Sequence, residues 1–151
     1  KKENSDLIYF VEDDYLHFEN SLTDMINTYE RVSSQSEKDI IICPCDYPFN
    51  YMSNEKTNIL IGSNQHWRTV QKILCTFMIS KKMLEKYWDN LIKTCEKRHD
   101  PFEKYINEIL LNEIGISPIN TLSIHLTNVN SSYGLSPFVD IKKLWDENNT
   151  S

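Results

Sequence analysis

The chain has 151 residues, of which 25% are charged and 11% aromatic, and its formal net charge is −6. These values are typical of a globular protein and argue against a disordered, collagen-like or disulfide-stabilised chain. The length favours a single domain over residues 1–151. Because the basic residues are scattered, no positive stripe is available for a phosphate backbone, and we expect no nucleic-acid partner.

The sequence has no segment that predicts a membrane span or export. No apolar run approaches the roughly 20 residues that cross a bilayer, and the first residues, KKENSD, lack the apolar stretch of a signal peptide. We therefore expect a cytoplasmic location. Cys43 and Cys45 are separated by one residue, unlike the C-x-x-C of zinc sites, so we expect reduced, mostly buried thiols, including Cys75 and Cys95.

The first predicted elements alternate between strand and helix. Residues 7–11 form a continuous apolar run, which is typical of a strand covered on both faces in a parallel sheet. Apolar residues then recur at helical spacing from Phe18 to about Val32 and predict an amphipathic helix. Residues 40–43 predict a second buried strand. The prolines in residues 44–51 predict a loop without regular structure, which is a candidate wall of a site.

The middle of the chain predicts a hairpin followed by a helix. Residues 58–62 and 69–80 are rich in β-branched and apolar residues and predict strands, with residues 65–68 in the connection. Residues 81–95 place their apolar side chains on one stripe, so we expect a single helix whose stripe, including Trp88, faces the core.

The C-terminal third predicts a helix, a strand and a final helix. Asp100 is followed by proline and is typical of an N-cap, with Glu103 closing a capping box and Gly115 ending the helix. Residues 121–126 predict a last strand, and residues 140–147 predict a short terminal helix. The whole succession favours an α/β fold with a mixed, mainly parallel sheet flanked by helices.

Three consecutive carboxylates, Glu12, Asp13 and Asp14, follow the first predicted strand directly. Neighbouring like charges raise each other's pKa, so such a group is costly unless a counter-charge is present. A divalent cation with oxygen ligands would supply it, and ligands of α/β sheets bind at the carboxyl ends of strands. The alternative is an acidic, solvated turn stabilised by the dipole of the following helix.

Residues 8–16, IYFVEDDYL, resemble the acidic metal motif, often written D-x-D, of A-type nucleotide-sugar glycosyltransferases. Residues 45–48 (CDYP), residues 66–68 (HWR), and His125 followed by residues 136–138 (SPF) are similar in order and spacing to segments of such enzymes. The resemblance implies a Rossmann-related, A-type fold. It also implies a metal-dependent transfer of a sugar from a nucleotide diphosphate sugar to a hydroxyl group.

The resemblance assigns a metal site at the acidic motif. It makes Asp14 the direct ligand of Mn²⁺ or Mg²⁺, with Glu12 as a further metal and donor contact and Asp13 as a donor contact. His125 would complete the metal shell, because neutral imidazole suits a borderline ion such as manganese. A single histidine on an apolar strand is equally compatible with a hydrogen-bonded core residue.

The resemblance also suggests roles for residues outside the acidic motif. Arg68 would steady the leaving diphosphate, and Trp67 would pack its flat face against a sugar ring. A surface hairpin with a partly buried tryptophan is the alternative. Asp100, ahead of Glu103, is the candidate catalytic base if the transfer inverts stereochemistry, whereas a plain helix cap explains both acids without chemistry.

A complete A-type enzyme carries a βαβ unit upstream of its acidic motif. Only about six residues stand before the first strand here, so the resemblance implies that part of the N-terminal nucleotide-binding half is missing. A second chain or a homo-oligomer would then complete the fold. The expected partners are a UDP-sugar and a glycan, lipid or protein acceptor. Two other functions stay open, a magnesium-dependent phosphoryl-transfer or hydrolase domain and a non-catalytic carbohydrate- or protein-binding module.

Overall fold

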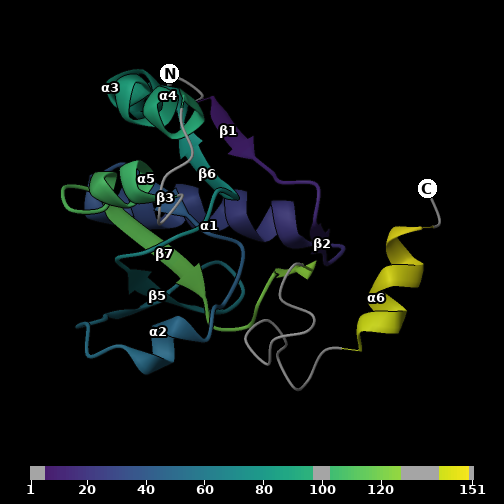
Figure 1. Cartoon of the computed structure of the whole chain (residues 1–151). Helices are drawn as coiled ribbons and strands as arrows, with labels where there is room; N and C mark the ends of the chain where they lie inside the picture. Colours follow the sequence, from purple (N-terminus) through teal and green to yellow (C-terminus); the bar gives the residue numbers. More distant parts are fainter. Residues whose placement is uncertain (1–5, 97–102, 127–139, 150–151) are drawn as a thin grey trace.

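A mixed, six-stranded sheet forms the centre of the protein, as Figure 1 shows for a computed structural model that describes residues 6–96, 103–126 and 140–149. The strand order is β1-β6-β3-β7-β5-β4. The strands are β1 Leu7–Phe10, β3 Ile40–Ile42, β4 Ile59–Ile61, β5 His66–Val70, β6 Phe77–Ser80 and β7 Ile114–Pro118. The expected α/β class is confirmed.

The expected predominance of parallel strands is wrong. Within the described residues, β3 and β7 form the one parallel pair, and the other neighbours in this sheet are antiparallel. The reason lies in the connections, because β4 and β5 are joined by a tight hairpin and β6 runs antiparallel between β1 and β3. β1 is also an edge strand with half-buried side chains, not a strand covered on both faces.

Alternate residues of the central strands face two separate cores. Ile40 and Ile42 pack with Met25 of helix α1 (Ser21–Ser36) on one face of the sheet. Ile41 and Met83 belong to the core on the other face, which also contains residues of α5 (Lys104–Ile109). Successive side chains of a strand point to opposite faces of the sheet, so a short apolar run contributes to both cores. The result is a three-layer arrangement with a helix on one face of the sheet and helices on the other.

The single helix predicted over residues 81–95 is wrong. The structure has α3, Lys81–Lys86, and α4, Trp88–Glu96, with the break at Tyr87, whose backbone leaves helical geometry (φ −112°, ψ 22°). Ser80 caps α3 by accepting a hydrogen bond from the backbone N–H of Met83 at 3.0 Å. Because the break redirects the chain, Trp88 is 53% exposed and does not face the core.

Two boundaries predicted between residues 44 and 70 are also wrong. Residues 44–51 include the start of a short helix, α2 (Phe49–Met52), because Pro48 occupies the N-cap, where a missing N–H costs little. Residues 66–68 belong to strand β5 and not to the hairpin connection. The connection is tighter, and the N–H of Gly62 donates to the carbonyl of Gln65 at 2.9 Å.

A second, two-stranded sheet pairs β2 (Tyr15–His17) with β8 (Ser123–His125) in antiparallel fashion. The predicted last strand therefore exists, but it lies outside the central sheet. Helix α6, Ile141–Asn148, buries Leu144 in a small cluster with residues of this ribbon. Asp140 caps α6 by accepting from the N–H of Lys143 at 3.0 Å, and the predicted terminal helix is confirmed.

Helix α5 differs from its prediction at both ends. It starts after Glu103, whose side chain makes no capping hydrogen bond, and Gly115 lies in β7 and does not end the helix. Asp100 lies outside the described residues. Across the part of the chain that the structure describes, every helix is too short or too polar to cross a membrane.

The cysteines carry no disulfide, as expected. Cys43 and Cys45 are buried, Cys75 is half-buried and Cys95 is exposed. Burial raises the pKa of the Cys45 thiol to about 11, so this side chain stays protonated near neutral pH. The prediction of mostly buried thiols is therefore confirmed for the C-x-C pair and wrong for Cys95.

Candidate metal site

The acidic motif lies at the point where the chain leaves the central sheet and enters the two-stranded ribbon. The backbone N–H of Glu12 donates to the Oγ1 of Thr76 at 3.0 Å, which fixes the end of β1 against the residue that precedes β6. A turn at Asp13 and Asp14 follows, and β2 begins at Tyr15. The turn leaves Asp13 exposed and Asp14 half-buried.

The register of the ribbon brings His125 to this turn. Tyr15 is the direct partner of His125, and the N–H of Leu126 donates to the carbonyl of Asp14 at 2.8 Å. As a result the Nε2 of His125 lies 3.0 Å from the Oδ2 of Asp14. The two side chains are separated by 111 positions in the sequence, so only strand pairing can bring them together.

Glu12, Asp14 and His125 form a compact group of potential metal ligands. Each offers one ligand atom, and these atoms all lie within 4.8 Å of one another. Two carboxylates with one imidazole suit Mn²⁺, whereas Mg²⁺ prefers oxygen ligands. The donor set therefore fits the predicted cation, and it contains the three residues that the sequence analysis names as ligands.

The electrostatics of the group favour a cation. Burial raises the pKa of Glu12 above its ordinary value, the negative charge of Asp14 raises it further, and His125 acts in the opposite direction. A carboxylate held beside another carboxylate in a partly buried position is unfavourable without positive charge nearby. A divalent cation bound between these side chains would remove that cost.

Two tyrosines hold the imidazole in place. The ring of Tyr15 stacks on that of His125, with centroids 4.5 Å apart and planes inclined by 10°. The hydroxyl of Tyr15 is hydrogen-bonded to that of Tyr47, and burial raises the pKa of both phenols, so both stay neutral. The sequence pattern did not predict a supporting role for Tyr15 or Tyr47. The tyrosine directly after the acids was the available signal.

The predicted contact between Trp67 and a sugar ring is wrong. Trp67 is 0% exposed and packs in the core formed with α1, so neither face of its ring is available to a ligand. Strand alternation explains this, because His66, its neighbour in β5, is exposed while Trp67 points inward.

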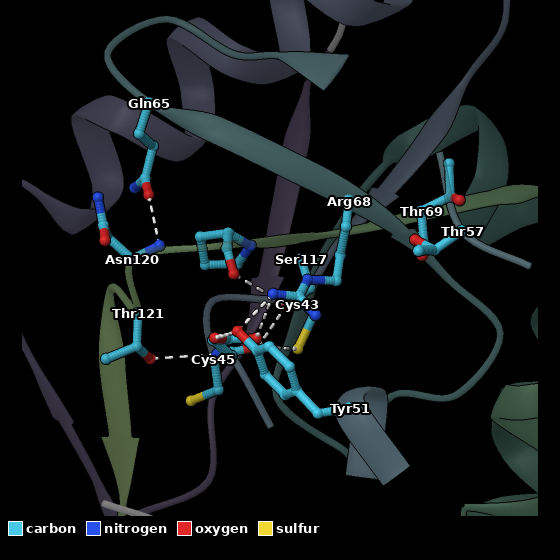
Figure 2. A network of polar contacts seen from close by, with 12 residues as sticks. Cys43, Cys45, Tyr51, Thr57, Gln65, Arg68, Thr69, Ser117, Asn120 and Thr121 are labelled. Carbon is cyan, nitrogen blue, oxygen red and sulfur yellow. Dashed lines mark hydrogen bonds and ion pairs between the residues drawn. The ribbon is translucent and has the colours of Figure 1, made fainter. Parts of the chain in front are cut away.

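Arg68 is nearly buried and belongs to a different network, which Figure 2 shows. Its guanidinium lies 3.5 Å from the carboxylate of Asp46 and donates to the hydroxyl of Tyr51, which in turn donates to Asp46. The same guanidinium lies 4.1 Å from the centre of the Tyr51 ring. These contacts give Arg68 a structural role between β5 and the segment after β3, and contact with a diphosphate stays a prediction.

Asp100 and Glu103 are the two candidates for a catalytic base, and of these the structure describes only Glu103. Its charge contributes to the raised pKa of Glu12, after burial and the charge of Asp14, so the carboxylates of Glu103 and Glu12 are close enough to interact. Glu103 occupies the N-cap of α5 without a side-chain capping hydrogen bond to that helix, and the capping box predicted with Asp100 lies outside the described residues. The role of Glu103 as a base, like the donor contact of Asp13, stays a prediction.

Comparisons of this chain with protein-family models, curated protein sequences and solved structures find no match. The geometry and chemistry of the group formed by Glu12, Asp14 and His125 are therefore the basis on which a function can be proposed.

Proposed function

We propose that this chain carries the metal-binding part of a glycosyltransferase that transfers a sugar from a nucleotide diphosphate sugar to a hydroxyl acceptor. One observation carries the proposal. Glu12, Asp14 and His125, which the resemblance singles out as metal ligands, come from two distant segments and place their ligand atoms within 4.8 Å of one another. An acidic turn that only caps a helix has no need of a histidine from the other end of the chain.

Each residue of the group and its neighbours would have a separate role in binding the metal or the donor. Asp14 and His125 would hold the cation, with Glu12 as the third ligand, and the bound Mn²⁺ would supply positive charge for the leaving diphosphate. Tyr15 keeps the imidazole oriented, because its ring covers one face of His125. Asp13, exposed on the turn, is free to reach the donor sugar or ribose.

The transfer itself forms one bond and breaks one. The acceptor oxygen attacks the anomeric carbon of the sugar, and a new C–O bond forms there. The bond from that carbon to the diphosphate oxygen breaks, and its electron pair leaves with the nucleoside diphosphate. The acceptor proton passes to a carboxylate within hydrogen-bond reach, for which Glu103 is the described candidate.

The proposal is tested by calorimetric titration of Mn²⁺ into the wild-type chain and into Asp14→Asn. We expect saturable binding by the wild type and at least a tenfold loss of affinity in the variant, because a ligand carboxylate is lost while the size of the side chain is kept. Glu30→Gln, on the exposed face of α1, is the matched control and should bind as the wild type does.

Nucleotide binding separates the remaining alternatives. UDP and UDP-sugars should bind more tightly when Mn²⁺ is present, and Asp14→Asn should lose this enhancement. Equal Mn²⁺ affinity in wild type and Asp14→Asn would overturn the proposal and leave a non-catalytic module. Manganese binding that enhances affinity for phosphate monoesters but not for UDP-sugars would favour a phosphoryl-transfer or hydrolase domain instead.

A further inference from the structure

Strand β4 (Ile59–Ile61) is an edge strand of the central sheet, with β5 as its one partner among the strands that the structure describes. The extended segment continues back to Thr57, whose Oγ1 donates to the carbonyl of Thr69 at 2.7 Å (Figure 2). The backbone N–H of Asn58 donates to the Oγ1 of Thr69 at 2.9 Å. Residues 57–62 therefore form one continuous edge that is held to β5 on one side only.

The outer side of this edge presents backbone groups that are spaced for another strand. The N–H of Gly62 donates to the carbonyl of Gln65 at 2.9 Å, which sets the hydrogen-bonding pattern between β4 and β5. Antiparallel strands alternate between residues that bond to the partner and residues that do not, so Leu60 also directs its N–H and C=O toward β5. The N–H and C=O groups of Ile59 and Ile61 therefore point away from the sheet.

The side chains on this edge are apolar and exposed. Ile59 is 57% exposed and Ile61 is 62% exposed, and both lie on the same face of the sheet. Leu60, between them, points to the other face and packs against the core formed with α1. Residues 57–65 include no proline and no charged side chain, which are the usual means of protecting a sheet edge from pairing. Backbone and side chains of β4 thus both favour the addition of a strand.

The opposite edge of the sheet, β1, has a different character. Its side chains are half-buried, and it is flanked by the carboxylates of Asp6 and Glu12. Antiparallel pairing of two copies of β1 would bring the Asp6 end of one strand beside the Glu12 end of the other. Because like charges placed opposite each other destabilise strand pairing, a second copy is disfavoured at β1 and not at β4.

The β4 edge is complementary to itself. When two copies run antiparallel about a two-fold axis through Leu60, Ile59 of each copy lies opposite Ile61 of the other. Each of these pairs exchanges two backbone hydrogen bonds, so all the outward N–H and C=O groups of Ile59 and Ile61 find a partner. The isoleucines pack in pairs on one face, and the two Leu60 side chains meet on the other. Lys56 lies opposite Asn64, so no like charges are opposed along this edge.

We propose that this chain forms a two-fold symmetric dimer in which β4 pairs with β4 of a second copy and joins the two six-stranded sheets into one. A second copy fits better than an unrelated strand, because one register satisfies the outward backbone groups and buries the exposed isoleucines against each other. The candidate metal site follows β1 at the opposite edge of the sheet, so the dimer leaves both copies of that site accessible. The dimer does not depend on the proposed function.

Sedimentation equilibrium over a wide range of protein concentrations tests the dimer. We expect the mass of the wild type to rise with concentration from that of one chain to that of two. Ile59→Lys and Ile61→Lys should each weaken the dimer about tenfold or more, because the symmetry places the new charge in the interface twice. Both positions are exposed, so neither variant is expected to unfold the chain, and circular dichroism confirms this.

Leu22→Lys is the matched control, because Leu22 is 51% exposed on α1 and lies outside the β4 edge. It should dimerise as the wild type does. A wild type that keeps the mass of a single chain at every concentration would overturn the proposal. Equal weakening by Ile59→Lys and Leu22→Lys would also overturn it, because the loss would then follow from added charge and not from the strand edge.

Disulfide trapping tests the register. Leu60→Cys is made in a Cys95→Ser background, since Cys95 is exposed, and is oxidised with oxidised glutathione. The two-fold register places position 60 opposite itself, so a disulfide-linked dimer should form, and adding Ile59→Lys should suppress it. Ser63→Cys, at an exposed position that lies opposite Thr57 in this register, should give much less linked dimer. Equal trapping at positions 60 and 63 would contradict pairing about Leu60.

Discussion

The ring of Tyr15 stacks almost parallel on the imidazole of His125, with centroids 4.5 Å apart. Because the two residues are register partners in the ribbon of β2 and β8, the backbone pairing and the ring contact position the imidazole together. Asp14, one residue before Tyr15, lies within hydrogen-bond distance of the same imidazole. The orientation of a potential metal ligand is therefore set by a neighbour that offers no ligand atom to the group.

Removal of the Tyr15 ring should weaken metal binding. Tyr15→Ala leaves one face of His125 unsupported, and we expect its Mn²⁺ affinity to fall about tenfold, as for other residues that orient metal ligands. Tyr15→Phe keeps the ring and loses only the hydrogen bond to Tyr47, so its affinity should stay within about threefold of the wild type. Calorimetric titration measures both, with circular dichroism to confirm folding. Unchanged affinity in Tyr15→Ala would show that the ring does not position the histidine.

The contribution of Glu113 to stability should depend on pH. Burial opposes its ionisation, but hydrogen bonds from Lys86 and Tyr87 outweigh that effect and lower the pKa of Glu113 below its ordinary 4.5. A lowered carboxyl pKa stabilises the fold above the unfolded value, and this stability is lost as pH falls through the folded pKa. Glu113→Gln should therefore destabilise the protein at neutral pH, and its deficit should shrink below pH 4.5.

Urea denaturation across this pH range measures the free energy of unfolding of wild type and Glu113→Gln. Glu30→Gln, on an exposed face of α1, is the control and should show no such pH-dependent difference. A deficit in Glu113→Gln that stays constant from neutral to acidic pH would show that the hydrogen bonds to Lys86 and Tyr87 do not favour the ionised carboxylate.

The two tryptophans Trp67 and Trp88 should differ sharply in their contributions to stability. Trp67 is fully buried, so Trp67→Ala should lower the free energy of unfolding by about 3 to 5 kcal/mol. Trp88 is 53% exposed, so Trp88→Ala should cost less than about 1 kcal/mol. Denaturant melts of the two variants measure the difference. Similar losses in both would contradict the break between α3 and α4.

Gly62 should not tolerate a side chain. A Cβ atom added there would lie 2.2 Å from the Nε1 of Trp67 and 2.8 Å from the Oγ1 of Thr28, and both neighbours are fully buried. We expect Gly62→Ala to cost about 1 to 3 kcal/mol in denaturant melts, because the indole must shift within a packed core. Ser63→Ala, at the next and exposed position, should stay within about 0.5 kcal/mol of the wild type.

Local patterns predicted several elements well because neighbours in the sequence determine them. The helical repeat of apolar residues predicted α1, and the apolar run of residues 40–43 predicted β3. The terminal helix predicted over residues 140–147 corresponds to α6. The acidic turn was visible for the same reason, since three adjacent carboxylates and the apolar strand before them are all local features.

Other properties depended on packing between distant segments, and the sequence could not predict them. A short apolar run has the same sequence pattern in a parallel and in an antiparallel sheet. The antiparallel pairing of β1 with β6 was therefore not predicted. The exposure of Trp88 follows from the break at Tyr87, and the burial of Trp67 follows from the direction that β5 takes against α1.

The sequence by itself determined the chemistry of the candidate site, because the identities of Glu12, Asp14 and His125 fix which donor atoms are available. Only the tertiary structure decided that these atoms meet. The β2–β8 register places His125 opposite Tyr15, and a shift of one residue would turn the imidazole to the other face of the ribbon. The identity of each side chain is given by its own position in the sequence. The distance between two side chains is set by the strand pairing that joins the segments carrying them.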